Sequence, residues 1–575
     1  QPVAGDYPQA GDVAVIGWVP WNDPAGNNGK PHGIAMNQTE TVAELRFSQM
    51  KSVANAPVAR VYAFNFQFRP TVVLNHTGVQ GQLSGGIVSG EGAFWIRSTG
   101  GNLSDPAFTN VDLGSFNLQD SSYFIYENTL ASGTYVNVPA SFPNLMMATD
   151  GWGAEDKNST IQKDISINGN LELLGDINLL LNTGATGNIT VRRDLKFFRS
   201  NANGNDSGGG GEIRFGNTGT ARTITVQGNL KLGNGYDAMI SIPSPGTTPL
   251  AHNVNLYGSF VQLTTAGFGF KGGTSSTNDH ITLNLLGSTS ASLINAGGDV
   301  PQCYALTVNK GSSIGTTVTA TANFTLSAPT NVAAKALTLS NGLLILNNAS
   351  ININLTTGGG DFRIPSTAGL EVRQGTASVS GTDTGVLLDG LLRVSGGTVT
   401  IDGGAGFNNY IEYSASGMAT LEVTGGTLTV ASQVRRNLTS TTGVLKYLQT
   451  AGSVTVGRRT APSATRGVFE VLNTGSQFIH TGGSFLMVQG VNSTTVPSLW
   501  LEPESSSVTA GSTIDIGDAN TPSGVNSQNI GIKSSIPLYH LNIAGANSPV
   551  VKIYILPLTL QGNLLISSAL SNATL

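Results

Sequence analysis

A degenerate motif, a glycine followed by a short alternating strand, recurs in the second half of the chain and restricts the fold more than any other feature. Six copies begin at residues 373, 395, 424, 450, 481 and 509: RQGTASV, SGGTVTI, TGGTLTV, TAGSVTV, TGGSFLMV and TAGSTIDI. Successive copies start 22 to 31 residues apart. Because each copy alternates polar and apolar residues, it predicts a strand with one buried face. A period of this length predicts a solenoid with one coil per repeat.

Further short strands are predicted within one period. Residues 410–430 contain YIEY, LEV and TLTV, and residues 468–488 contain VFEVL, QFIH and FLMV. Three short strands separated by Gly-rich corners form one triangular coil of a parallel β-helix. We therefore expect an all-β fold, with a right-handed parallel β-helix over residues 151–575. The final residues contain no recognisable cap, so the repeats are expected to continue beyond 575.

A nine-residue cassette suggests the role of the corner glycines. It occurs as ISINGNLEL at 165–173, ITVQGNLKL at 224–232 and LTLQGNLLI at 558–566. Apolar residues stand at positions one, three, seven and nine, and glycine at position five. Glycine and asparagine both tolerate left-handed backbone angles, so the cassette predicts strand, corner, strand. A corner glycine also avoids a side-chain clash that stacking at about 4.8 Å would repeat in every coil.

Residues 1–150 differ from the rest of the chain in composition. Trp18, Trp21 and Trp95 lie here, leaving two of the five tryptophans for the rest of the chain. The open end of a solenoid exposes unpaired backbone and needs a cover. We therefore expect an aromatic-rich N-terminal cap region, with atypical first coils, over residues 1–150. The chain starts with Gln1, which is typical of a mature product whose signal peptide has been removed.

Composition argues against several classes of function. Only 11% of residues are charged and the net charge is −5, so the chain offers no basic stripe for nucleic acid. No apolar run approaches the roughly 20 residues of a membrane helix, and we expect no direct membrane insertion. The single cysteine, Cys303, excludes an intramolecular disulfide framework and is expected to be a small buried residue.

Two longer segments resemble a known family. They are FPNLMMATDGWGAEDKNSTIQKDISINGNLELLGDINLLL at 142–181 and LYHLNIAGANSPVVKIYILPLTLQGNLLIS at 538–567. Both are similar to the repeat units of very large secreted surface proteins of the Bacteroidota, and the resemblance covers most of 140–575. It implies a relation to gliding-motility adhesins of the SprB type, exported by type IX secretion. Cell-surface anchoring or secretion machinery would then be partners, and the bacterial cell surface the location.

Two sets of residues are candidates for binding. Asn201, Asn203, Asn205 and Glu212 have the one, three, five, twelve spacing of a calcium loop, although Asp206 occupies the usual glycine position and the early ligands are neutral amides. Calcium affinity should therefore be poor, and a corner loop without metal is the alternative. The second set comprises Trp18, Trp21 and Trp500, which either stack on carbohydrate or are buried in a cap or coil core.

The catalytic patterns of known β-helix enzymes are missing from the sequence. It contains no Asp-Asp pair and no Gly-His-Gly, and its six histidines are scattered. We expect no enzyme activity and no cofactor. The predicted function is an extracellular structural or adhesive rod that contacts an external surface or a glycan. The alternative is a polysaccharide-binding or polysaccharide-degrading β-helix protein.

Overall fold

The computed structural model confirms an all-β solenoid of stacked parallel strands, with no helix in its described residues. The description covers residues 141–567 except 150–156, 162, 175–176, 182–186, 199–210, 217–219, 234–237, 243–249, 264–268, 275–278, 329–334, 357–359, 414–416, 460–462, 492, 523–528, 545–548 and 555–556, together with eight strand backbones between residues 13 and 135. The chain divides into an N-terminal unit (Gln1–Leu283 with Ile294–Gln302) and a C-terminal unit (Asn284–Leu293 with Cys303–Leu575).

In the N-terminal unit, parallel strands stack in columns. One column contains β3 (Asn65–Phe68), β5 (Ala93–Ser98), β7 (Tyr123–Asn128), β10 (Asn144–Thr149), β13 (Leu171–Leu174), β16 (Leu195–Phe198), β19 (Leu230–Leu232) and β22 (Phe260–Gln262). The second contains β9 (Ser141–Phe142), β12 (Ile165–Ile167), β15 (Ile189–Val191), β18 (Thr223–Val226) and β21 (Ala251–Leu256). The third contains β8 (Gly133–Tyr135), β11 (Lys157–Ile161), β14 (Ile177–Leu181), β17 (Glu212–Phe215) and β20 (Met239–Ser241). A separate sheet contains β1 (Val13–Ile16), β2 (Glu44–Phe47), β4 (Ile87–Gly90) and β6 (Phe116–Leu118).

Alternation fills the core of this unit with vertical rows of apolar side chains. Leu171, Leu195, Leu230 and Phe260 are in register on successive coils, and all are buried. Burying one such side chain contributes roughly 1.5–3 kcal/mol. The rows therefore favour one register, because a one-residue slip would turn a strand's apolar side chains toward solvent.

The C-terminal unit repeats the same plan. Its first column contains β31 (Phe362–Ile364), β34 (Gly385–Leu388), β37 (Tyr410–Tyr413), β40 (Val434–Arg436), β43 (Phe469–His480), β45 (Leu499–Val508), β47 (Asn529–Ser534) and β49 (Val550–Ile553). The second contains β27 (Thr317–Ala320), β29 (Leu337–Leu346), β32 (Ala368–Val372), β35 (Leu391–Val394), β38 (Met418–Val423) and β41 (Val444–Gln449). The other strands of this unit outside the third column are β26 (Ala305–Lys310) and β28 (Thr325–Leu326), while β23 (His280–Gly287), β24 (Ala291–Asn295) and β25 (Gln302–Cys303) contain residues of both units.

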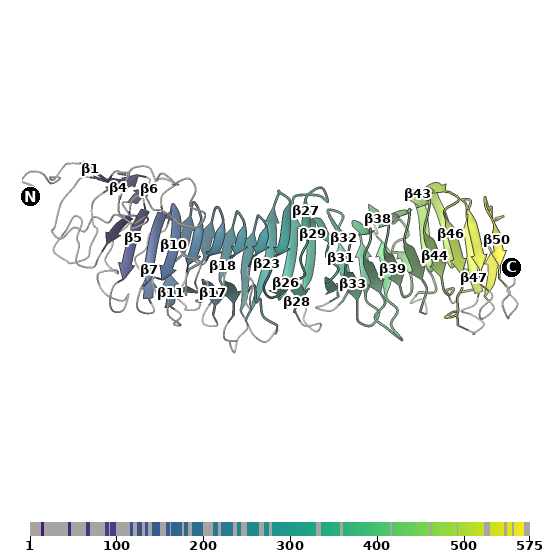
Figure 1. Cartoon of the computed structure of the whole chain (residues 1–575). Helices are drawn as coiled ribbons and strands as arrows, with labels where there is room; N and C mark the ends of the chain where they lie inside the picture. The colour runs from purple at the N-terminus through teal and green to yellow at the C-terminus, as the bar shows by residue number, and fades with distance from the viewer. Residues whose placement is uncertain are drawn as a thin grey trace, which may run out of the picture. The chain divides into compact units, whose positions relative to one another are not determined.

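The six copies of the repeated glycine-strand motif, which begin at residues 373 to 509, lie in the third column of this unit, as the sequence predicted. Its strands are β30 (Asn352–Asn354), β33 (Thr376–Val379), β36 (Thr398–Ile401), β39 (Thr427–Val430), β42 (Ser453–Val456), β44 (Ser484–Met487), β46 (Thr513–Ile516), β48 (His540–Ile543) and β50 (Leu564–Ile566). Six of the nine come from the six sequence copies. Figure 1 shows β33, β39, β44 and β46 following one another along the unit.

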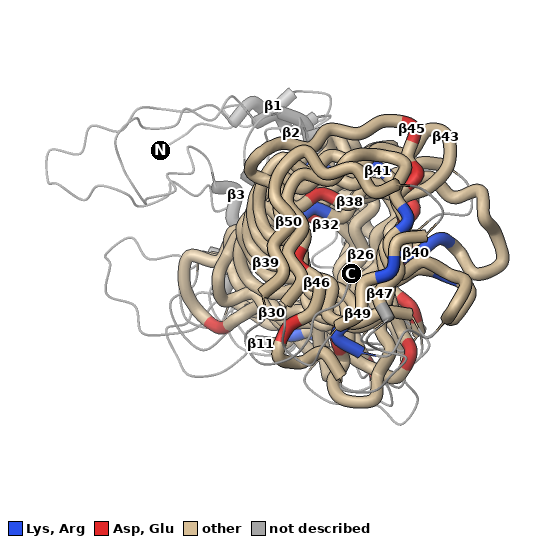
Figure 2. The backbone as a smooth tube through the Cα atoms, turned by 90° about the vertical axis from the view of Figure 1, so that its right-hand side faces the viewer, with Lys and Arg blue, Asp and Glu red and all other residues tan. Residues whose placement is uncertain are grey.

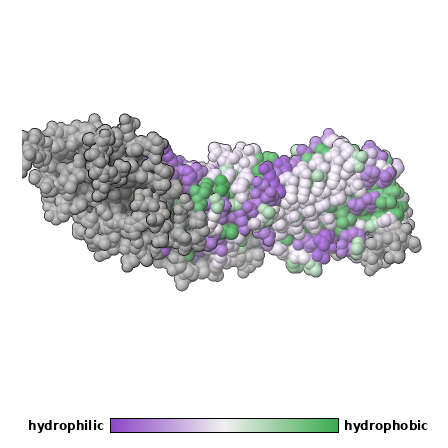
Figure 3. All heavy atoms as spheres, in the orientation of Figure 1, coloured by the Kyte–Doolittle hydropathy of each residue, from purple (hydrophilic) through white to green (hydrophobic). Residues whose placement is uncertain are grey.

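The outer face of this column is a wall of hydroxyl groups. Thr398 and Thr400 point outward between buried apolar residues, and Thr427 and Thr429 repeat them in register one coil later. In the end-on view of Figure 2, the wall with β39, β46 and β50 has few charged residues, whereas charged residues gather beside β40 and β45. In Figure 3 the surface over β33, β39 and β44 is a broad, nearly white area of intermediate hydropathy.

The first two cassettes form strand, corner and strand, as predicted, and of the two reasons given for their glycine only the avoidance of a stacking clash is confirmed. Gly169, Gly228 and Gly562 do not have left-handed φ angles, and neither do the asparagines that follow them. An added Cβ at Gly228 would instead lie 2.6 Å from the carbonyl carbon of Arg193 in the preceding coil. Close stacking of backbone therefore requires the glycine, and the left-handed explanation was wrong for these positions.

Candidate functional site

The clearest departure from the regular coil occurs in β43 and β45. The sequence predicted two strands, VFEVL and QFIH, but the structure has one twelve-residue strand, β43, which runs through the corner. The neighbouring ten-residue strand β45 does the same. Their pairing shifts between Asn473 and Gln477, where three residues of β43 lie opposite the single residue Glu504 of β45. This is a bulge in place of a corner.

The corner narrows over three successive coils. In the first coil seven residues, 437–443, connect β40 to β41. In the second coil the three bulge residues between Asn473 and Gln477 take the place of this loop, and in the third coil Glu504 alone does. Asn473 Nδ2 donates to the carbonyl oxygens of Thr441, at 2.7 Å, and Gly443, at 2.6 Å. The Gly475 N–H donates to Glu504 Oε2 at 2.5 Å. Side chains of each coil thus fasten the corner of the coil before it.

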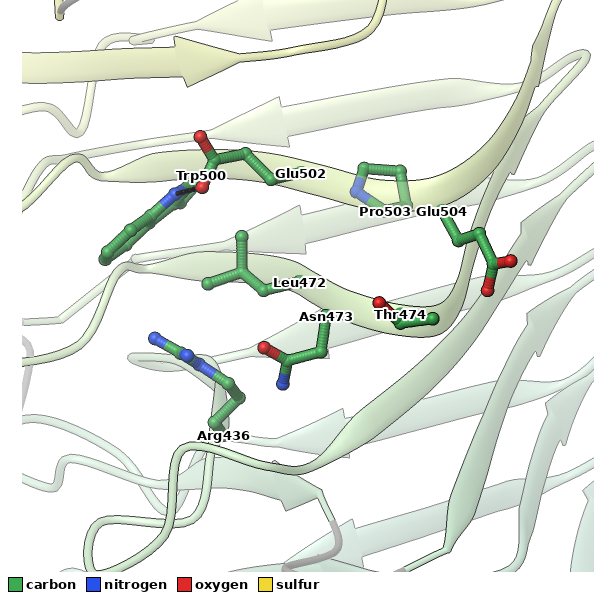
Figure 4. A pocket seen from close by; sticks show the side chains of 8 residues that line it. All are labelled: Arg436, Leu472, Asn473, Thr474, Trp500, Glu502, Pro503 and Glu504. Carbon is green, nitrogen blue, oxygen red and sulfur yellow. Dashed lines mark hydrogen bonds between the residues drawn. The ribbon is translucent and has the colours of Figure 1, made fainter.

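A pocket of about 360 Å³ lies beside this narrowing corner, on the outer face of the C-terminal unit. Figure 4 shows Leu472 near its centre, Arg436 and Trp500 at one end, and Thr474 and Glu504 at the other. The volume is at the low end of the roughly 300–1,000 Å³ typical of small-molecule sites. Its lining residues are Arg436, Leu472, Asn473, Thr474, Trp500, Glu502, Pro503 and Glu504.

Trp500 is half-buried on the outer face of β45, between Leu499 and Leu501, which point into the core. Its Nε1–H donates to Glu502 Oε2 at 2.7 Å. Lys533 Nζ lies 2.8 Å from Glu502 Oε1 and 5.0 Å from the centroid of the Trp500 ring. Arg436 Cζ is 5.4 Å from the same centroid, within the roughly 6 Å range of cation–π attraction. These contacts fix the orientation of the indole.

A buried ion pair supports the Trp500 end of the pocket. Arg436 Nε lies 3.1 Å from Glu470 Oε2, and the Glu470 side chain is 0% exposed. Glu470 Oε1 also accepts the Gly467 N–H at 2.6 Å. Breaking a buried pair by removing one partner costs several kcal/mol, because the other charge stays in a dry environment. The position of Arg436 is therefore set by the fold before any ligand binds.

The chemistry of the pocket is that of recognition by contact and hydrogen bonding. Trp500, Leu472 and Pro503 provide apolar surface, while Asn473, Thr474 and the two glutamates provide hydrogen-bonding groups. Asn473 has a φ of 83°, a left-handed angle that few non-glycine residues adopt. Such backbone strain is frequent at ligand sites. The described residues contain no group of three or more His, Cys, Asp or Glu side chains arranged to hold a metal ion.

Of the residues proposed from sequence, only Trp500 belongs to this pocket. Trp18 and Trp21 lie outside the described residues, so their stacking role stays a prediction. The alternative of core burial is wrong for Trp500, which lies half-buried on the outer face of its coil. Sequence reasoning missed Arg436, Asn473 and Glu504. The turn-forming residues Asn473 to Ser476 mark the place, but they equally fit an ordinary corner.

The calcium prediction stays untested, because Asn201, Asn203 and Asn205 lie outside the described residues. Glu212 begins β17, where it is buried. Its Oε2 lies 2.6 Å from Arg214 Nε, and its Oε1 accepts the hydroxyl of Ser241. The structure thus shows Glu212 bound to neighbouring side chains of its own column.

Other titratable residues that the sequence highlighted are part of the core. Cys303 is buried, as expected, and burial raises the pKa of its thiol to about 12. Burial also lowers the pKa of His252 and that of His480 to about 4. Both histidines are therefore neutral at pH 7, and the two lie in different units.

Comparison with protein-family models, with curated proteins and with solved structures finds no match for this chain. In the described part of the chain, no helix is long and apolar enough to cross a membrane. Any statement about function therefore depends on the coil architecture and on the pocket beside Trp500.

Proposed function

We propose that this chain is an extracellular structural and adhesive part of a large bacterial cell-surface protein, mediating attachment or gliding-type surface interaction. The observation that supports it is repetition within the C-terminal unit. From β33 to β46, six strands stack in register and present outward rows dominated by Thr and Ser. Parallel strands at about 4.8 Å spacing give a surface that grows by one identical step per coil.

The charged residues of this unit also support a structural role, because many bind one another across coils. Arg393 Nε lies 2.6 Å from Glu422 Oε2 in the following coil, and its Nη1 lies 3.3 Å from Glu371 Oε2 in the preceding coil. Burial opposes ionisation of Glu371, but the hydrogen bonds from Arg373 and Ser395 outweigh it and lower its pKa. Glu371 therefore stays ionised and links neighbouring coils at neutral pH.

The proposal is tested by deleting the gene in the source bacterium. The deletion strain should attach or glide poorly while growing normally on polysaccharides, and protease added to intact wild-type cells should digest the protein. Undigested protein on intact cells, or normal attachment by the deletion strain, would contradict the proposal.

Polysaccharide binding is the second candidate, and the pocket with Trp500 is the observation that favours it. A polysaccharide-degrading activity would show itself differently. The deletion strain would lose growth on one glycan, and the purified protein would cleave that glycan.

A further inference from the structure

We infer that the pocket beside Trp500 binds one uncharged sugar residue of a glycan chain, with the indole as its stacking platform. This inference rests on the adhesive function proposed above and names the class of ligand for it. Four features support it: the shape of the corner, the fixed aromatic ring, the hydrogen-bonding groups and the balance of charge.

The shape comes from the backbone itself. The bulge of β43 and the continuous path of β45 replace two corners, and the hollow lies between these two strands and Arg436, the residue before the loop of the preceding coil. Asn473 keeps its left-handed φ while its amide holds the carbonyls of Thr441 and Gly443. The hollow is therefore preformed and rigid, which lowers the entropy lost when a ligand binds.

The platform is the Trp500 ring. Its Nε1–H is bound to Glu502, and Glu502 is bound to Lys533, so the ring does not need to be ordered by the ligand. The apolar face of a sugar ring consists of C–H groups, which pack well against an indole. Leu472 and Pro503 continue the apolar surface next to it.

The polar groups suit hydroxyls. A sugar hydroxyl both donates and accepts, and the pocket offers carboxylate acceptors at Glu502 and Glu504, the amide oxygen of Asn473 and a hydroxyl at Thr474. In Figure 4 Thr474 and Glu504 lie at the opposite end of the pocket from the Trp500 ring, and Asn473 lies between the two ends. A ligand held at both ends would stack one part of its ring and hydrogen-bond the other.

The charge balance selects against acidic sugars. The lining residues include Glu502, which is paired with Lys533, Arg436, which is paired with buried Glu470, and Glu504, whose charge is not balanced by a salt bridge. A uronic acid would bring a further negative charge toward exposed Glu504. Like charges in contact disfavour binding, so neutral residues are preferred.

The test uses the purified 575-residue chain with laminarin, mannan and arabinogalactan as neutral probes and polygalacturonate as an acidic probe. Binding is followed by calorimetry and by tryptophan fluorescence. At least one neutral glycan should bind, and polygalacturonate should bind about tenfold more weakly or not at all. Binding of polygalacturonate alone, or of no neutral probe, would overturn the inference.

Four substitutions locate the site. Trp500→Ala should weaken binding about tenfold or more, and Trp500→Phe, which retains an aromatic ring, should weaken it less and abolish the fluorescence change. Met418→Ala, at an exposed residue of β38 outside the pocket, is the matched control and should bind like the wild type. Glu504→Gln keeps an acceptor for Gly475 but removes the charge, so it should raise the affinity for polygalacturonate relative to the affinity for a neutral glycan.

Circular dichroism melts of each variant separate a lost site from a lost fold. Unchanged glycan binding in both Trp500 variants, each folded, would overturn the inference. If cells that carry the folded Trp500→Ala variant attach normally, the adhesive contact lies elsewhere on the protein. The proposed function would then stand without this site, whereas normal attachment by the full deletion strain would remove the function itself.

Discussion

The two units hold their corners together with different hydrogen-bond acceptors. In the N-terminal unit, a side-chain oxygen accepts the backbone N–H of the next coil at 2.8–3.0 Å, in a ladder from Asn144 through Asn170, Asp194 and Asn229 to Ser259. In the C-terminal unit, the corners before the third column use main-chain carbonyls instead. There, Gly375, Gly397, Gly426 and Gly452 accept N–H groups of the next coil at 2.9–3.0 Å.

Glycine is frequent in both ladders. In the C-terminal ladder four successive positions are glycine, although Ile351 accepts the Thr376 N–H one coil before them, and Gly426 combines a φ of 64° with stacking so close that an added Cβ would overlap the Gly397 carbonyl oxygen. In the N-terminal ladder, the residue before the side-chain acceptor is Gly169 in one coil, Arg193 in the next and Gly228 in a third. Larger residues therefore occur in both ladders, at Arg193 and at Ile351, and glycine is required only where the stacked backbones approach most closely.

The largest expected effect is at Gly426. Gly426→Ala should destabilise the C-terminal unit by roughly 2–5 kcal/mol, because about 1–2 kcal/mol of left-handed strain adds to about 1–3 kcal/mol of overpacking. Chemical denaturation gives the total, and hydrogen exchange should show lost protection in β36, β39 and β42. A loss below about 1 kcal/mol would mean that the stacked carbonyls can move apart.

Gly417→Ala is the matched control for Gly426. Its φ is 91°, but an added Cβ would meet nothing within 4 Å. The cost should be the backbone strain alone, about 1–2 kcal/mol. Equal losses in the two variants would show that stacking contributes nothing.

The sequence predicted the column structure well because the relevant information is local. Each copy from 373 to 509 alternates apolar and polar residues, and each became a strand of one sheet in register. The sign of φ was not predictable in this way. Gly397 and Gly426 follow the same Gly-Gly pattern in corners of three residues, yet only Gly426 is left-handed, so neither the motif nor the length of the corner gives the sign of φ.

The pocket was predictable only in part. Trp500 stood out because tryptophan is rare in this half of the chain, but its partners Arg436 and Lys533 come from other coils, 64 residues before it and 33 after it. Which residues become neighbours in adjacent coils depends on the register between those coils. Because the loops differ in length from coil to coil, this register cannot be predicted from one sequence. The bulge at Asn473 was hidden for the same reason, because Asn-Thr-Gly-Ser also fits a normal corner.

Gly228→Ala tests the side-chain ladder at a corner where an added Cβ would meet the backbone of the preceding coil. The added Cβ would lie 2.6 Å from Arg193 backbone atoms and from Asp194 Oδ1, so we expect a loss of about 1–3 kcal/mol from overpacking without left-handed strain. The same denaturation and exchange measurements apply, with the effect in β18 and β19. A neutral result would show that this corner relaxes as it does around Arg193.

Asn170→Ala removes one acceptor of the ladder without adding bulk. The Asp194 N–H then loses its partner at 3.0 Å, and the expected loss is about 1 kcal/mol since the corner is only partly buried. Gln227→Ala, at an exposed residue of a neighbouring corner, should stay within about 0.5 kcal/mol of the wild type. If both variants behave alike in thermal melts, the ladder describes geometry but contributes little free energy.

The smallest expected effect concerns acid, and it separates the two ladders because only the side-chain ladder contains a titratable group. Burial opposes ionisation of Asp194, but hydrogen bonds from Lys231 Nζ, at 2.6 Å, and from the Asn229 N–H outweigh it and hold its pKa below 3.8. A carboxyl whose pKa is lower in the folded protein adds stability above its unfolded pKa, and this stability is lost as the pH falls through the folded value.

Below about pH 4 the N-terminal unit should therefore lose up to about 1 kcal/mol at this position, a small amount because Asp194 and Lys231 are partly exposed. Asp194→Asn keeps an oxygen acceptor for Asn229 but removes the titration. Hydrogen-exchange protection of β16 and β19 should fall between pH-corrected measurements at 5 and 3 in the wild type and fall less in the variant. Protection of β36 and β39, beside the main-chain ladder of the C-terminal unit, should be the same in the wild type and in Asp194→Asn. An equal acid response in wild type and variant would show that Asp194 acts in the ladder as a neutral acceptor does, and its charge would then play no part in holding the coils together.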